Sequence, residues 1–267
     1  MTSERVSQRA FFGVSALLFV ASAAATTAWC ASMPAMGGMS MPGGCTMSDC
    51  TMSMEGISAP GPTWPGAAPF VGMWVVMMVA MMLPSLVPML WRYRQAVGRA
   101  GDGRLGRLTA LVGAGYFLVW TLFGIAAYPL GVALAAVELR LPVLARAVPI
   151  AAGAVVLIAG ALQFSAWKAR HLACCREAPG RGRSLQADAG TALRHGLRLG
   201  LHCSYACAGL TAILLVIGVM DLRAMAVVTT AITIERLAPA GERVARAIGA
   251  VAVGAGLLLI ARAAGLG

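Results

Sequence analysis

Residues 70–90 read FVGMWVVMMVAMMLPSLVPML, and this uncharged stretch decides the fold. About 20 predominantly apolar residues are enough for an α-helix to cross the hydrocarbon core of a bilayer. The stretch therefore predicts a membrane-spanning helix. Pro84 has no amide hydrogen to donate, so we expect a kink or local opening near residues 80–85.

Methionine is the unusual component of this helix. Residues three and four positions apart are neighbours on a helix, so most of the methionines share one side with Trp74. Methionine fills irregular gaps between packed helices, and a ladder of thioether sulfurs also suits Cu(I). Both interpretations are open at this point. The methionines of the stretch are Met73, Met77, Met78, Met81, Met82 and Met89.

The composition of the whole chain is that of an integral membrane protein. Of its 267 residues, 59% are hydrophobic and 12% are charged, whereas soluble domains have about 25% charged residues. A net charge of +11 suggests nucleic acid as the partner of a soluble protein, but no aromatic residues interleave with the basic ones here. Membrane proteins concentrate Lys and Arg in cytoplasmic loops. We therefore expect lipid, and no nucleic acid, as a partner.

Seven apolar segments predict an all-α, polytopic transmembrane bundle of about seven spans. The first segment is either a retained helix or a cleaved signal peptide, which would leave six spans. We divide the chain into a first span or signal segment (1–30), a Met/Cys-rich extracytoplasmic loop (31–69) and a transmembrane metal-binding domain (70–267). The predicted spans are 10–29, 70–90, 108–136, 147–166, 199–219, 224–238 and 247–262.

Basic residues predict the orientation of these spans. Seven spans with a cytoplasmic N-terminus put 17 of the 21 Lys and Arg residues inside. This asymmetry favours a multi-pass protein of the bacterial inner membrane with residues 31–69 outside. The late cysteines and histidines then lie at the cytoplasmic face. The inner segments are 1–9, 91–107, 167–198 and 236–246.

The outer loop contains MPAMGGMSMPGGCTMSDCTMSM, with seven methionines between Met33 and Met54. Methionines in a polar loop rich in Gly, Pro and Ser are not explained by core packing. We interpret them as metal-capturing residues, with low-complexity drift as the alternative. The predicted ligands here are Met33, Met36, Met39, Met41, Cys45 and Cys50.

A second group of candidate ligands lies at the inner face. KARHLACCREAP places His171 and Cys175 four residues apart, and GLHCSYACAGL does the same for Cys203 and Cys207. If both segments are helical, each pair shares a face. One imidazole and three thiolates suit a copper thiolate centre and also Zn(II). Buried cysteines that act as small hydrophobes are the alternative. Secondary candidates are Cys174, His202 and His195.

Two further features concern the packing of the predicted helices. Glu235 lies near the cytoplasmic end of its span, and we expect an interfacial carboxylate paired with Arg236 or Arg243. Gly196 and Gly200 form a small-xxx-small pair, which predicts close approach of another helix.

Four landmarks carry a resemblance to a known family. They are MWVVMMVAMMLPS at 73–85, the stretch from Lys168 to Pro179, GLRLGLHCSYAC at 196–207, and GVMDLRAM leading to Glu235–Arg236. Over about Gly72 to Pro239 the chain resembles bacterial predicted metal-binding integral membrane proteins. This is a domain-of-unknown-function family whose members are often labelled copper chaperones.

The resemblance implies metal binding in the membrane, with two departures from the family pattern. A cysteine usually stands at the position of His171, and Gly-Cys-Cys usually stands where this chain has Tyr205, Ala206 and Cys207.

Together these features predict a protein that captures and relays Cu(I), with zinc as the alternative metal. The outer methionines would capture the ion, those of 70–90 would bridge, and the inner Cys/His set would receive or donate it. A periplasmic or cytoplasmic metal donor or acceptor protein is the expected partner. We do not expect an enzyme.

Two other function classes remain open. One is a membrane thiol–disulfide oxidoreductase that uses Cys45 with Cys50 and Cys174 with Cys175, although the chain has no CxxC motif. The other is a structural or assembly subunit of a larger membrane complex.

Overall fold

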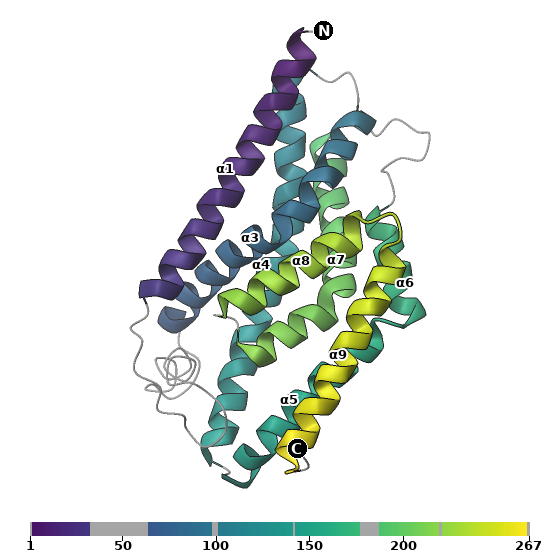
Figure 1. Cartoon of the computed structure of the whole chain (residues 1–267). Coiled ribbons are helices and arrows are strands. Elements are labelled where there is room, and N and C mark those ends of the chain that lie inside the picture. The colour runs from purple at the N-terminus through teal and green to yellow at the C-terminus, as the bar shows by residue number, and fades with distance from the viewer. Residues whose placement is uncertain are drawn as a thin grey trace.

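The computed structural model describes residues 2–32, 64–97, 101–140, 142–176, 187–218 and 221–265, and every regular element within them is an α-helix (Figure 1). The helices of these residues are α1 (Thr2–Ser32), α3 (Trp64–Val97), α4 (Asp102–Arg140), α5 (Pro142–Leu162), α6 (Ala166–Arg176), α7 (Ala189–Ile217), α8 (Leu222–Leu237) and α9 (Gly241–Ala263).

Five of these helices, α1, α3, α4, α7 and α9, are long and apolar enough to cross a membrane. Helices α5 and α6 meet at a bend of 64° and make a sixth candidate if they are one broken span. Helix α8 has 16 residues and is therefore about 24 Å long, shorter than the ~30 Å hydrocarbon core. Six of the seven predicted segments each overlap one helix, and 147–166 covers most of α5 and reaches the first residue of α6. The predicted all-α bundle is confirmed.

Helix starts follow from capping side chains. Asp188 Oδ1 accepts from the Thr191 amide at 3.0 Å, and Ser165 Oγ accepts from the Lys168 amide at 3.1 Å. Each bond satisfies an amide of the first turn that has no partner inside the helix. The sequence predicts one connection over 167–198, whereas its first part is α6 and its last part begins α7.

Helix α3 lies at the centre of the packed core. All six of its methionines in the 70–90 stretch are buried, with 0 to 5% of their surface exposed. The indole of Trp74 is also buried and donates to the Trp120 carbonyl at 2.9 Å. The helix continues through Pro84, so the predicted local opening does not interrupt it.

Helices α4 and α7 approach closely because α7 carries glycine at the contact. A Cβ atom on Gly196 would lie 2.2 Å from the Val112 carbonyl oxygen, and one on Gly200 would lie 2.9 Å from that of Tyr116. The close approach predicted from the small-xxx-small pair is therefore present. It brings Tyr116 against the part of α7 that carries the cysteines.

Several basic segments gather at one end of the bundle. Arg94 Nη2 donates to Ser7 Oγ at 2.9 Å, and Arg92 Nη1 donates to the Arg176 carbonyl at 2.9 Å. These bonds join the start of α1 and the ends of α3 and α6. Figure 1 shows the N-terminus at this end and the C-terminus at the opposite end.

We predict that Gly196→Ala lowers the free energy of unfolding in detergent. The added methyl group overpacks the α4–α7 contact, and overpacking costs typically about 1–3 kcal/mol. Gly113→Ala is the matched control, because a Cβ there meets nothing within 4 Å. Alanine at that position should be neutral or stabilising. Equal thermal stability of the two variants would contradict the close approach.

Candidate metal centre

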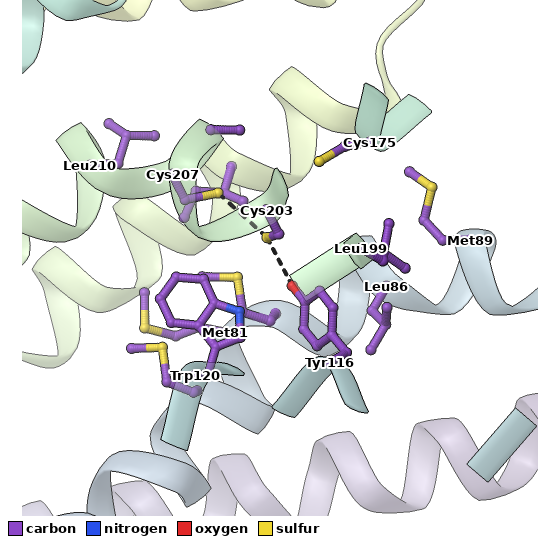
Figure 2. Close-up of a cluster of buried hydrophobic side chains, with 14 of the residues drawn as sticks. Met81, Leu86, Met89, Tyr116, Trp120, Cys175, Leu199, Cys203, Cys207 and Leu210 are labelled. Carbon is purple, nitrogen blue, oxygen red and sulfur yellow. Dashed lines mark hydrogen bonds between the residues drawn. The ribbon is translucent and has the colours of Figure 1, made fainter. Parts of the chain in front are cut away.

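Cys203 and Cys207 face each other on α7 (Figure 2). Both side chains are buried, and their sulfur atoms lie 3.8 Å apart. Two thiolates on one tetrahedral ion, each at a bond length of about 2.3 Å, have their sulfurs about 3.8 Å apart. The separation of the pair is thus compatible with two ligands of a single tetrahedral ion.

Residues of α3 and α4 border the pair. The Tyr116 hydroxyl lies 2.9 Å from Cys203 Sγ, and Figure 2 shows Trp120 and Met81 on the α3 and α4 side of the two thiols. On this side the pair is therefore bordered by aromatic and thioether groups, and thioethers favour a soft ion over a hard one.

A buried arginine stands beside these thiols. Arg236 Nη1 lies 2.8 Å from Ser85 Oγ, 3.2 Å from Cys203 Sγ and 3.4 Å from the Tyr116 hydroxyl. The Nε and Nη2 atoms of Arg236 are buried without a hydrogen-bond partner. We name Ser85, Tyr116, Cys203, Cys207 and Arg236 the arginine–thiol cluster. A buried charge is costly unless it is paired. A negative charge bound in this cluster would therefore be stabilised by the Arg236 guanidinium.

A buried ion pair lies next to the cluster. Lys168 Nζ lies 2.7 Å from Glu235 Oε2 and also donates to the Ala206 carbonyl at 2.5 Å. The expectation of an interfacial Glu235 paired with Arg236 or Arg243 is therefore wrong.

The corner between α5 and α6 explains this difference. Because α6 starts at the Ser165 cap, Lys168 falls on the buried face of α6 together with Leu172 and Cys175. Lys168 is thus not part of a solvated basic connection. It neutralises Glu235, so that carboxylate does not balance Arg236.

Cys175 lines a cavity of about 80 Å³. It is buried, whereas Cys174 is exposed. A polar cavity of this volume has room for water or a small ion. Exposed arginines stand at its edge. The lining residues are Met89, Arg92, Cys174, Cys175, His195, Arg198, Leu199 and His202.

The predicted histidine ligand contacts a different group of residues. His171 is half-buried, its Nδ1 lies 3.1 Å from Nδ1 of His202, and its ring packs against Trp167 and Tyr205. In the described part of the chain, no three His, Cys, Asp or Glu side chains are grouped closely enough to hold a metal ion. The four-ligand set of His171 with three cysteines stays a prediction.

The predicted methionine ligands fall into two sets. Those of α3 belong to the same core cluster as Cys203 and Cys207, apart from Met73, which is also buried. The loop ligands Met33, Met36, Met39, Met41, Cys45 and Cys50 lie outside the described residues.

Residues 71–259 match the sequence model of the PpoB2 family, which is described as copper chaperone. The chain belongs to this copper chaperone family. The match runs from α3 into α9 and includes the whole arginine–thiol cluster. It confirms the resemblance based on the four landmarks, and it makes a copper-related role the one that family membership supports. Searches of curated proteins and of solved structures found no match.

In this member of the copper chaperone family, the cysteines could be found from their spacing, but their polar neighbours could not. Ser85 and Tyr116 look like ordinary residues of apolar spans. Arg236 follows Glu235 directly, and two charges at the end of a span normally face the interface. For Ser85 and Arg236 the one available signal was their place among the family landmarks, whereas Tyr116 lies outside these landmarks.

We predict that Lys168→Met or Glu235→Leu alone destabilises the protein by about 3–5 kcal/mol, because each leaves one buried charge unpaired. The double variant should recover most of this loss. Arg243→Met is the control, since Arg243 is exposed and surface changes are usually within about 0.5 kcal/mol. Denaturant unfolding in detergent measures all four. If Arg243→Met lowered the free energy of unfolding as much as Lys168→Met, the result would support the ion pair between Glu235 and Arg243 that the sequence predicted.

Proposed function

We propose that this protein binds Cu(I) inside the membrane and relays it between methionine and cysteine sites. One observation carries the proposal. Buried thioethers of α3 and the buried thiols of Cys175, Cys203 and Cys207 belong to one continuous core. Family membership supports copper as the cargo. In this proposal the protein moves the ion and catalyses no reaction.

The two kinds of sulfur have different tasks in such a relay. Thioethers are neutral, so they bind Cu(I) without losing a proton, whereas thiols must ionise to bind. Several weak sites in sequence let an ion move without a deep trap, as conduction requires. Methionines are therefore suited to passing the ion, and the cysteine pair is suited to holding it.

The proposed route has three parts. The loop of residues 31–69 captures the ion, the α3 methionines pass it on, and the Cys203–Cys207 pair holds it. The cavity beside Cys175 then connects the core to the basic end of the bundle, where a donor or acceptor protein would exchange the ion. The ligands of the capturing loop are Met33, Met36, Met39, Met41, Cys45 and Cys50.

We place this protein in the bacterial inner membrane with the basic end in the cytoplasm. The hydrogen bonds that join α1, α3 and α6 at that end support this orientation, because they bring predicted inner segments together. The five or six candidate spans support a multi-pass protein.

We predict that Cys45 reacts with an impermeant thiol reagent in intact cells and that Cys174 reacts only after the cells are permeabilised. Cys174 is a better inner reporter than Cys175, because its side chain is exposed. Variants in which Cys45 or Cys174 is the sole cysteine of the chain isolate each signal. Reaction of Cys174 in intact cells together with protection of Cys45 would reverse the orientation.

We predict that the double variant Cys203→Ser/Cys207→Ser loses about one Cu(I) ion per chain. Serine keeps the size of cysteine but is a poor ligand for a soft ion. Metal analysis of protein purified without chelators and loaded with Cu(I) measures the loss. Cys30→Ser is the control, because Cys30 lies on α1, outside the pair and the proposed route.

The folded state is checked by thermal unfolding of the same samples. Full Cu(I) content in the folded double variant would exclude the cysteine pair as the holding site. The control should retain the Cu(I) content of the unsubstituted protein.

A further inference from the structure

We propose that Arg236 is the built-in counter-ion of Cu(I) held by Cys203 and Cys207, and that its charge selects a monovalent ion over a divalent one at this pair. The inference rests on the proposed function, because it concerns the holding site of the relay. It assigns a specificity role to a residue that is not itself a ligand.

The formal charges lead to this assignment. Two thiolates and one Cu(I) ion sum to a single negative charge, and the Arg236 guanidinium beside Cys203 brings the total to zero. Two thiolates and one Zn(II) ion are already neutral, so Arg236 would leave one positive charge in the core. Since an uncompensated charge in an apolar interior is costly, the first combination is favoured.

The neighbouring ion pair does not balance the charge of the thiolate–Cu(I) unit, so Arg236 is the group that does. Lys168 and Glu235 neutralise each other at 2.7 Å, and within the described ranges Arg236 forms no ion pair. The unbalanced charge next to the thiols is therefore that of the guanidinium.

The geometry of the guanidinium points to the same assignment. Ser85 and Cys203 both contact Nη1, which fixes one edge of the group. The Nε and Nη2 atoms remain buried without a partner. A thiolate–metal unit next to the guanidinium supplies the negative charge that this arrangement lacks.

The test compares Cu(I) and Zn(II) binding by the full chain in detergent for the unsubstituted protein, Arg236→Met and Arg236→Lys. Methionine removes the charge and keeps an unbranched side chain, whereas lysine keeps the charge. Competition with a chelator of known affinity gives each dissociation constant. Metal binding that is lost in the double variant Cys203→Ser/Cys207→Ser is assigned to the cysteine pair.

We expect opposite changes for the two metals in Arg236→Met. Cu(I) affinity should fall roughly 10- to 100-fold, because its complex becomes a buried anion without a counter-ion. Zn(II) affinity should rise, because its complex becomes neutral. Arg236→Lys should keep the preference of the unsubstituted protein for Cu(I). If Arg236→Met does not accumulate, Arg236→Gln serves as a second uncharged variant with the same expected result.

The outcomes separate this inference from the function on which it rests. Absence of Cu(I) from the cysteine pair of the unsubstituted protein overturns the proposed function and the inference together. Normal Cu(I) binding by the pair, with both affinities lowered or both unchanged in the uncharged variant, overturns only the charge selection. A purely structural role of Arg236 predicts that both affinities fall.

Discussion

Burial of the Arg236 guanidinium removes a full positive charge from water, and an unpaired charge in an apolar interior costs several kcal/mol. Polar atoms from three other helices converge on it: Ser85 from α3, Tyr116 from α4 and Cys203 from α7. The positions of these helices relative to α8 are therefore coupled to one side chain. Any rearrangement that separates α8 from the thiols would expose the charge to apolar surroundings.

Close contacts elsewhere make this convergence sterically feasible. Glycines of α7 let the backbone of α4 approach, which puts the Tyr116 hydroxyl within reach of Cys203. On the other side, Lys168 ties α6 both to α8 through Glu235 and to α7 through the Ala206 carbonyl. That carbonyl directly precedes Cys207, so the ion pair and the thiol pair are mechanically connected through one peptide unit.

Local patterns made much of this fold predictable. Apolar length predicted every described helix except the basic α6, and the four-residue spacing predicted that Cys203 and Cys207 share a face, because both depend on residues close in sequence. The partners of Arg236 could not be predicted, since Ser85 and Tyr116 are 151 and 120 residues away. For His171, a short-range pattern did not predict the contact that the side chain makes. Its spacing from Cys175 is helical, yet its Nδ1 lies 3.1 Å from Nδ1 of His202 on α7, and spacing within α6 does not reveal a contact with another helix.

The arginines of the cavity set the electrostatic potential at its opening. Arg92 and Arg198 are exposed, and both line the cavity that contains Cys175. Two positive charges raise the electrostatic energy of an approaching free cation and lower that of an anion. A bare copper ion is thus repelled at this opening, whereas copper enclosed by negatively charged ligands is attracted. In the proposed relay, this opening would therefore favour an anionic complex of the metal over the free cation.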